Sequence, residues 1–379
     1  MGNVFIIGSK GYNKNYGGWE TFAKCLVDNF NGNIKFYVTE ISIDDDEIYD
    51  INNVTCIKVK TSNYGKASML LYTINSFKRV IKYIEDNNIE NPIIYVLGLK
   101  LGPYLTLYKR KLKKLNIKVL VNPDGLEHKR SKWSWYVKLF FMYSMKTMLK
   151  NCDKIVCDSK GIMEYFSKYK DKTTYIAYGT DIVEVQNEKK VLKEYNLKSN
   201  DYYLVVGRFV PENNFETIIK EFMKTNTKKK LIIISNIEKN KFYDSLLENT
   251  KFDTDNRIIL LNAIYDKSKL VVIRKNAYAY IHGHSVGGTN PSLLESLNVT
   301  NLNILYDCIF NKEVGKNSCY YFNKSNDNLK NLINNLDKLN KNEIISLGNE
   351  CKNIIKNNYT WKIVVNKYNK LFKEVLDED

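Results

Sequence analysis

Short apolar runs alternate with amphipathic stretches along the first half of the chain, and this alternation predicts a parallel β-sheet covered by helices. The apolar runs are short and nearly free of polar residues, which is typical of strands buried on both faces. The predicted strands are residues 4–7, 35–38, 93–97, 119–122, 154–157 and 174–177. The predicted helices lie near residues 18–30, 66–88, 103–115, 134–150 and 160–168.

The same alternation restarts after a polar stretch at residues 184–200, which we interpret as an inter-domain linker. The pattern therefore predicts an N-terminal domain over residues 1–183 and a C-terminal domain over residues 201–358. The strands predicted for the second domain are residues 202–206, 231–234, 258–261, 277–281 and 303–305.

A last amphipathic segment, residues 359–379, has Thr360 as a helix N-cap and one apolar face, and we expect it to pack back on the N-terminal domain. The predicted fold class is α/β, with two Rossmann-like doubly wound parallel-sheet domains that face a central cleft.

The composition is that of a globular chain. Hydrophobic residues make up 44% and charged residues 26% of 379 residues, and no apolar run is long enough to span a membrane. The first residues form a strand-like run and lack the order of a secretion signal. Seven irregularly spaced cysteines indicate reduced thiols in the cytoplasm, with Cys152 and Cys157 as core residues.

The chain carries 58 Lys and Arg against 42 Asp and Glu, a formal net charge of +16. Nucleic acid, an anionic membrane surface and phosphorylated substrates are the partners that such a charge fits. No helix-turn-helix, RNA-recognition or zinc motif is present, so we expect no nucleic-acid partner. Residues 44–46 are three successive aspartates in a polar stretch, interpreted as a solvated loop, and we expect no metal.

The most informative stretch runs from residue 277 to Glu295. A strand-like run is followed by a loop with two adjacent glycines, and then by Asn290 and Pro291, which suit the N-cap and first position of a helix. Such a helix start offers backbone amides and a positive dipole end to a phosphate group. Glu295 lies about one turn into the helix, where a carboxylate can accept hydrogen bonds from sugar hydroxyls. We therefore predict a nucleotide-sugar site.

Other loops also carry candidate chemistry at predicted carboxyl ends of strands. The glycines of residues 8–20 are too widely spread for a dinucleotide fingerprint, which leaves a ligand role and a long strand-to-helix turn both open. Arg208 has the planar fork that suits a diphosphate, or it is a surface arginine beside a turn. Residues 122–133 gather Asp124, Glu127, His128, Lys129 and Arg130, and all three histidines, His128, His282 and His284, occur in such loops.

Residues 129–150 are unusually aromatic and basic. They fit a buried helix with lysines along its rim, or an interfacial surface that rests on anionic lipid.

Together these segments resemble glycosyltransferases of the GT-B fold, family 4, and within it the bacterial rhamnosyltransferase branch, of the β-1,4-rhamnosyltransferase type. The matching segments run from residue 4 to residue 297 and include Val4-Phe-Ile-Ile-Gly-Ser-Lys-Gly11, Tyr16-Gly-Gly-Trp-Glu-Thr-Phe22, Asn122-Pro-Asp-Gly-Leu-Glu127, Lys129-Arg-Ser-Lys-Trp133, Cys157-Asp-Ser-Lys-Gly-Ile162, Tyr178-Gly-Thr-Asp181, Gly207-Arg-Phe-Val-Pro-Glu-Asn-Asn214, Asn276-Ala-Tyr-Ala-Tyr-Ile-His-Gly-His284 and Gly287-Gly-Thr-Asn-Pro-Ser-Leu-Leu-Glu295.

The resemblance implies metal-independent transfer of L-rhamnose from dTDP-β-L-rhamnose with retention of configuration. It implies an acceptor sugar on a polyprenyl diphosphate, and a cytoplasmic enzyme held peripherally at the inner face of the plasma membrane. The residues expected to act catalytically are Asp124, His128 and Arg208. Those expected at the donor are Gly17, Gly18, Arg208, His282, His284, Gly287, Gly288, Thr289, Asn290 and Glu295. Those expected on the acceptor side are Tyr16, Glu20, Glu127, Lys129 and Arg130.

The chain departs from the family pattern at three places. Gly287 stands where family 4 commonly has the first glutamate of a Glu-x7-Glu motif, and Ser285 where many members of the branch have glutamate. Asn213 and Asn214 replace a lysine. Two alternatives therefore stay open: a UDP-hexose or UDP-N-acetylhexosamine transferase of the same fold, and a non-catalytic GT-B protein that binds a partner.

Overall fold

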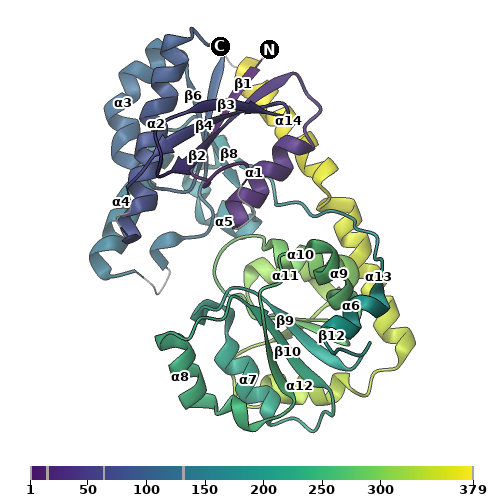
Figure 1. Ribbon diagram of the computed structural model, residues 1–379. Helices are drawn as coiled ribbons and strands as arrows, with labels where there is room; N and C mark the ends of the chain where they lie inside the picture. Colours follow the sequence, from purple (N-terminus) through teal and green to yellow (C-terminus); the bar gives the residue numbers. More distant parts are fainter. Residues whose placement is uncertain (1, 14–16, 63–64, 130–132, 378–379) are drawn as a thin grey trace. The chain divides into compact units, whose positions relative to one another are not determined.

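The computed structural model describes residues 2–13, 17–62, 65–129 and 133–377, with the backbone alone for Lys66 and Lys129. The chain divides into two compact units (Figure 1). The first is Met1–Gly179 together with Trp361–Asp379, and the second is Thr180–Thr360. The chain first passes from one unit to the other between Gly179 and Thr180, which is before the predicted linker at residues 184–200. Residues 188–194 of that linker form a helix that packs against α9 of the second unit. Its apolar Val191 is buried in this contact region.

The first unit is built on an eight-stranded sheet with the order β3-β4-β2-β1-β5-β6-β7-β8. All neighbouring pairs are parallel except β3 with β4. The central strands are buried along almost their whole length, which explains their continuous apolar sequence. The strands are β1 (Gly2–Ile7), β2 (Ile34–Ser42), β3 (Ile48–Ile51), β4 (Val54–Lys60), β5 (Pro92–Leu97), β6 (Lys118–Asn122), β7 (Lys154–Cys157) and β8 (Thr173–Tyr175).

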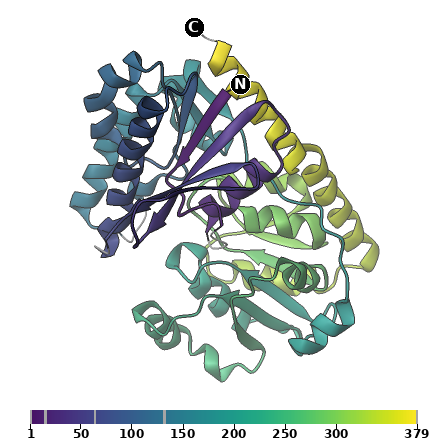
Figure 2. The same cartoon turned by 45° about the horizontal axis from the view of Figure 1, so that its top comes forward.

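Helices cover both faces of this sheet, with α2, α3 and α4 on one side and α1 and α14 on the other (Figures 1 and 2). Figure 2 shows the C-terminal helix α14 running beside the first strands. Its buried Tyr368 places its hydroxyl 2.8 Å from that of Tyr95 on β5, so this helix belongs to the core of the first unit. The helices are α1 (Gly18–Asp28), α2 (Ser68–Asp86), α3 (Gly102–Lys114), α4 (Trp135–Asn151), α5 (Lys160–Tyr165) and α14 (Trp361–Asp377), with 3-10 turns η1 (Gly65–Ala67), η2 (Glu127–Lys129) and η3 (Ser167–Lys172).

The second unit has a six-stranded sheet in the order β11-β10-β9-β12-β13-β14, and every neighbouring pair is parallel. Consecutive parallel strands need crossover connections, and the intervening helices supply them. The strands are β9 (Tyr202–Val206), β10 (Lys230–Ser235), β11 (Ile258–Asn262), β12 (Ala279–His282), β13 (Asn303–Tyr306) and β14 (Tyr320–Phe322).

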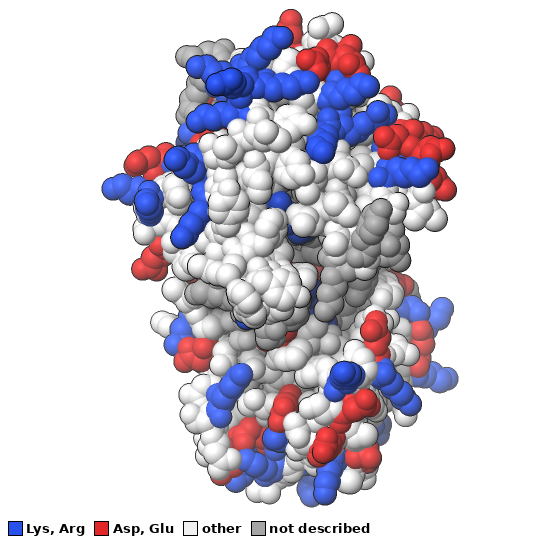
Figure 3. Space-filling model, turned by 90° about the vertical axis from the view of Figure 1, so that its left-hand side faces the viewer, with Lys and Arg blue, Asp and Glu red and all other residues white. Residues whose placement is uncertain are grey.

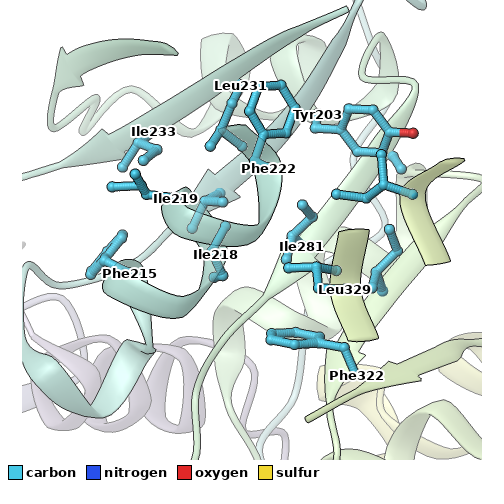
Figure 4. Close-up of a cluster of buried hydrophobic side chains, with 14 of the residues drawn as sticks. Tyr203, Phe215, Ile218, Ile219, Phe222, Leu231, Ile233, Ile281, Phe322 and Leu329 are labelled. Carbon is cyan, nitrogen blue, oxygen red and sulfur yellow. The ribbon is translucent and has the colours of Figure 1, made fainter. Parts of the chain in front are cut away.

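One core cluster of the second unit fills the space between α7, α12 and the sheet. Figure 4 shows Ile218, Ile219 and Phe222 of α7 close to Leu231 and Ile233 of β10, all of them buried. The helices of this unit are α6 (Glu188–Glu194), α7 (Phe215–Met223), α8 (Lys241–Thr250), α9 (Lys267–Lys275), α10 (Pro291–Val299), α11 (Ile309–Gly315), α12 (Asn328–Leu336) and α13 (Lys341–Asn358), with 3-10 turns η4 (Pro211–Asn213), η5 (Phe252–Thr254) and η6 (Lys316–Ser318).

The prediction of two parallel-sheet α/β domains is confirmed, but three strands were missed. β3 begins at Ile48, in the polar stretch around residues 44–46 that was interpreted as a solvated loop. No strand was predicted over β4, and β14 is a three-residue edge strand. The strand predicted at residues 174–177 is β8, which begins one residue earlier and ends two residues earlier, and the helix predicted near residues 160–168 ends at Tyr165 and is followed by η3. β3, β8 and β14 are short and partly exposed, so their apolar signal is weak, whereas β4 is a seven-residue, mostly buried strand whose apolar run is interrupted by Thr55 and Lys58.

Residues 44–46 are exposed, as expected for a solvated loop. Asp45 is paired with Lys60 and Asp46 lies near Arg79. Cys152 and Cys157 are buried core residues, as predicted, and all seven cysteines are free thiols. Over the described ranges, none of the helices has the length and apolar character needed to cross a bilayer.

Candidate functional site

The loop between β1 and α1 is closed by a buried glutamate. Glu20 is 5% exposed, and its Oε1 accepts a hydrogen bond of 2.7 Å from the backbone N–H of Lys10. Gly17 has φ +128°, and a Cβ on it would lie 2.0 Å from Oε2 of Glu20. Gly18 is the first residue of α1. Glu20 therefore holds the loop backbone, whereas Tyr16 lies outside the described residues.

The loop after β6 carries the predicted acceptor-side carboxylates. The backbone N–H of Asp124 donates to Oδ1 of Asn122 over 2.9 Å, and Asp124 has φ +57°. Asparagine and aspartate tolerate this left-handed conformation in tight turns. Oε1 of Glu127 accepts from Nε1 of Trp133 over 2.9 Å, which ties the two ends of the loop together.

His128 lies in the same loop, with its Nε2 3.3 Å from the hydroxyl of Tyr165 at the end of α5. The predicted residues Asp124, Glu127 and His128 are thus on one loop at the carboxyl end of β6 and are half-buried. The side chain of Lys129 and all of Arg130 lie outside the described residues.

In the second unit, α10 begins as the sequence predicts. Asn290 is the N-cap, its side chain accepts from the backbone N–H of Ser292 over 2.9 Å, and Pro291 occupies the first helical position. Gly287 has φ +127°, a conformation that favours glycine. Residues 287–289 are buried, while residues 290–292 and Glu295 are half-buried. The accessible part of this helix start is therefore its first turn rather than the glycines before it.

Glu295 is paired with a buried arginine. Oε2 of Glu295 lies 2.7 Å from Nη1 of Arg274 in the last turn of α9, with side-chain exposures of 31% and 2%. Nη2 of Arg274 donates to Oγ of Ser292 over 2.9 Å. One guanidinium thus holds two residues of the same α10 face, and Arg274 was not among the residues that the sequence singled out.

A buried polar chain continues from Ser292 to the end of β12. The hydroxyl of Tyr280 lies 3.1 Å from Oγ of Ser292 and 3.2 Å from Nδ1 of His282. His282 is the last residue of β12 rather than a loop residue. Burial, followed by the charges of His284 and Arg274, lowers the pKa of His282 well below its ordinary value, so this imidazole is neutral. Its Nε2 is buried and has no hydrogen-bond partner among the described residues.

Hydrogen bonds join the loop after β12 to the loop after β9. Nδ2 of Asn213 donates to the carbonyl of Arg208 over 2.6 Å, so Oδ1 of Asn213 faces Nδ1 of His284, 2.9 Å away. An amide oxygen only accepts, hence Nδ1 of His284 carries the proton in this contact. Nδ2 of Asn214 donates to the carbonyl of Gly283 over 2.7 Å.

Ser285 adds two further contacts between these loops. Its backbone N–H and its hydroxyl both donate to the carbonyl of Glu212, over 3.1 and 2.8 Å. Ser285, Asn213 and Asn214, which make up two of the three departures from the resembled pattern, are therefore residues that fix the two loops to each other. The sequence showed the departures but not this role, because the contacts join positions about 70 residues apart.

Arg208 follows β9 and is exposed, and within the described ranges its guanidinium makes no hydrogen bond or ion pair. Its carbonyl is held by Asn213, so the backbone beneath the side chain is fixed while the side chain is free to turn toward a ligand. Arg208, His282, His284, Asn290 and Glu295 all lie in the second unit, at the ends of β9 and β12 and the start of α10.

Comparison with solved structures gives matches of the same fold over the whole length of the chain. Sucrose-phosphate synthase from Thermosynechococcus elongatus superposes with a TM-score of 0.80 at 12% identity, over 100% of each chain. A glycosyltransferase from Rickettsia africae gives a TM-score of 0.75 at 16% identity, over 100% of this chain and 99% of that one. The HepE protein of Anabaena, solved in complex with UDP, gives a TM-score of 0.73 at 11% identity, over 99% of this chain and 100% of that one.

The chain has the GT-B fold. Identities this low establish the GT-B architecture and nothing about a substrate. Residues 1–181, just under half of the chain, match a family described as a domain of unknown function (DUF1972). None of the curated proteins matches the sequence.

Proposed function

We propose that this GT-B protein is a glycosyltransferase that takes its donor, a nucleoside-diphosphate sugar, in the second unit. The observation that carries the proposal is Glu295, a half-exposed carboxylate one turn into α10, fixed by the buried Arg274. A carboxylate held in this way accepts hydrogen bonds from ribose hydroxyls, and the first turn of α10 favours the negative diphosphate. Solved proteins of the same fold include one in complex with UDP and one bound with UDP-2-fluoroglucose.

The proposed reaction retains the anomeric configuration. The acceptor hydroxyl forms a bond to the anomeric carbon on the face from which the nucleoside diphosphate leaves, and its proton passes to the departing phosphate. The bond between the anomeric carbon and the phosphate oxygen breaks with its electron pair on the diphosphate. Arg208 and the N-terminal amides of α10 stabilise that charge, so the proposal needs no metal ion or other cofactor. The donor-contact role that the resemblance implies for Gly17, Gly18, Gly287, Gly288 and Thr289 stays a prediction. Because residues 287–289 are buried, we assign the diphosphate to the first turn of α10.

On the acceptor side we assign orientation of the acceptor hydroxyl to Asp124 or His128. Both are half-buried on the loop after β6, within one turn of Glu127. The proposed acceptor is a sugar on a polyprenyl diphosphate, and the basic residues of this loop, Lys129 and Arg130, suit its phosphates. Tyr16 and Glu20 complete the proposed acceptor side, with Glu20 acting through the loop backbone that it holds.

The donor that we propose is dTDP-β-L-rhamnose, and the rival is a UDP-hexose or UDP-N-acetylhexosamine. The test is turnover of each nucleotide sugar with an N-acetylglucosamine-diphosphate-lipid acceptor, read as released nucleotide and as glycosylated lipid. Rhamnosylated lipid from dTDP-rhamnose supports the proposal. Product from the UDP sugars alone selects the rival, and binding without product from any donor selects the non-catalytic alternative.

Replacing Arg208 with alanine is expected to lower kcat/KM about 10- to 100-fold, because one charge-assisted hydrogen bond to a charged group contributes about 1.5–3 kcal/mol. The unfolding temperature should stay unchanged, since the side chain is exposed. Lys338→Ala, which removes an exposed cation after α12, is the matched control and should retain full activity. Equal activity of Arg208→Ala and the wild type would remove Arg208 from the site.

We also propose that the first unit rests on an anionic membrane through α4. One face of this helix is buried through Phe141, Met145 and Met148, whereas the opposite face exposes large apolar residues at helical spacing: Trp135, Tyr136, Leu139, Met142 and Tyr143. Lys and Arg gather over the upper part of the first unit, next to an uncharged area (Figure 3). An apolar face with neighbouring cations suits an anionic bilayer.

The double variant Trp135→Ser/Leu139→Ser is expected to bind phosphatidylglycerol vesicles at least about 10-fold more weakly in co-sedimentation. The reason is that serine removes the apolar surface that Trp135 and Leu139 would bury in the bilayer. Ile309→Ser, an equally exposed apolar position on α11, is the control and should bind as the wild type does. Unchanged binding by the double variant would exclude α4 as the contact.

A further inference from the structure

A line of buried polar side chains runs from the C-terminal helix to the loop after β6. Tyr368 of α14 and Tyr95 of β5 are fully buried, and their hydroxyl oxygens lie 2.8 Å apart. Nδ2 of Asn122, the last residue of β6, donates to the hydroxyl of Tyr95 over 3.3 Å. Oδ1 of the same amide accepts from the backbone N–H of Asp124 over 2.9 Å. Three side chains therefore join α14 to the turn that carries Asp124.

The chemistry of these groups fixes how the amide of Asn122 is oriented. A backbone N–H can only donate, so the side-chain oxygen of Asn122 faces Asp124. The amide nitrogen therefore faces Tyr95, and the hydroxyl of Tyr95 has to accept. Burial raises the pKa of Tyr95 and the pKa of Tyr368, so both hydroxyls stay protonated and neutral. Loss of the accepting hydroxyl would leave a buried amide donor unsatisfied, which is costly.

The turn after β6 is held through both the backbone and the side chain of Asn122. Its carbonyl accepts a 2.8 Å hydrogen bond from the backbone N–H of Gly98, directly after β5. Its side chain accepts from Asp124, whose φ of +57° is a left-handed conformation that residues with a side chain adopt only at a cost in free energy. Pro123 has no backbone N–H, so Asp124 supplies the first amide that this turn can donate. The direction in which the loop leaves β6 therefore depends on how firmly the side chain of Asn122 is held.

We infer that Tyr95 and Tyr368 are positioning residues for the acceptor side of the proposed reaction, and that efficient transfer to the acceptor therefore depends on the C-terminal helix. Both tyrosines are fully buried, so they act through Asn122 and the turn at Asp124 rather than on a substrate directly. The inference rests on the proposed function. It adds to the acceptor side a segment, α14, that lies outside the loops at the strand ends.

Tyr95→Phe tests the inference, because it removes the accepting hydroxyl and keeps the ring in the core. We expect the backbone N–H of Asp124 to exchange with deuterium at least about fivefold faster, measured by mass spectrometry on peptides of the full-length protein that span residues 118–129. Transfer to the N-acetylglucosamine-diphosphate-lipid should fall about 3- to 10-fold in kcat/KM, the range that loss of one neutral hydrogen bond allows. The dissociation constants of dTDP and UDP should stay at their wild-type values, since the donor is assigned to the second unit.

Tyr72→Phe is the matched control. It also removes a fully buried hydroxyl of the first unit, one that donates to Oγ1 of Thr39 over 3.0 Å. Its exchange at Asp124 and its transfer rate should equal those of the wild type. An equal acceleration of exchange by Tyr72→Phe would overturn the inference, because the effect would then come from a general loosening of the core.

Tyr368→Phe tests the part of the inference that concerns α14. It should accelerate exchange at Asp124 by a smaller factor than Tyr95→Phe, because the hydrogen bond between Asn122 and Tyr95 remains. The double variant Tyr95→Phe/Tyr368→Phe should match Tyr95→Phe alone if the three side chains act in series, whereas independent effects would multiply. Wild-type exchange in Tyr368→Phe, or multiplied effects in the double variant, would overturn the dependence on the C-terminal helix.

Two further results would overturn the inference as a whole: unchanged exchange at Asp124 in Tyr95→Phe, and faster exchange with unchanged transfer. Absence of transfer by the wild type with any donor would contradict the proposed function instead. The exchange measurement needs no substrate, so it would still decide whether Tyr95 holds the turn.

Discussion

Replacing Glu295 with alanine is expected to lower sugar transfer more than 100-fold and to destabilise the second unit as well. The activity should fall because the proposed ribose anchor is gone, a charged hydrogen bond of about 1.5–3 kcal/mol, and because α10 loses a contact that fixes its first turns. The stability falls because Arg274 remains as a buried cation without its counter-ion. Since Glu295 is partly exposed, we expect a loss of about 2 kcal/mol, below the range for fully buried pairs.

Two effects of one substitution must be separated before the loss of activity is assigned to nucleotide binding. The double variant Arg274→Met/Glu295→Leu removes both charges and fills a similar volume, so stability should return toward the wild-type value while transfer stays low. Thermal unfolding and kcat/KM of the single and double variants provide the comparison. Recovery of activity in the double variant would show that Glu295 only stabilises the helix.

Replacing Gly283 with alanine is expected to be the most destabilising change in the loop after β12. A Cβ at this position would lie 2.0 Å from the carbonyl oxygen of Asn213 and 2.8 Å from Cδ1 of Ile218. The first contact is with backbone, which can move only if the hydrogen bonds between the two loops break. Overpacking of this kind costs about 3 kcal/mol, or roughly 10 °C in the unfolding temperature of a unit of this size.

Gly18→Ala is the matched control for that measurement. Apart from its chain neighbours and its own helix backbone, no described residue has an atom within 4 Å of a Cβ at this position, and the residue begins a helix. Its unfolding temperature should equal or slightly exceed that of the wild type. A Gly283→Ala protein that unfolds at the wild-type temperature would show that the loops after β9 and β12 yield easily, contrary to the packing described above.

The two-domain parallel-sheet architecture could be predicted from the sequence because strands buried on both faces leave continuous apolar runs, as in β1, β5 and β9. The edge strand β3 was missed because it alternates between exposed and half-buried residues among aspartates, and the inner strand β4 because Thr55 and Lys58 interrupt its apolar run. The helix start at Asn290 and Pro291 could also be predicted, because capping depends on neighbouring residues alone.

The sequence by itself determined the local parts of the candidate site: the cap of α10, the carboxylate one turn beyond it, and the loops at the strand ends. Only the tertiary structure decided what surrounds them. Arg274 reaches Glu295 from another helix, Asn213 and Asn214 bond to residues about 70 positions away, and Glu20, expected beside an acceptor, is buried against its own loop. Such contacts depend on which chain segments the fold brings together, and neither spacing nor residue type along the chain carries that information.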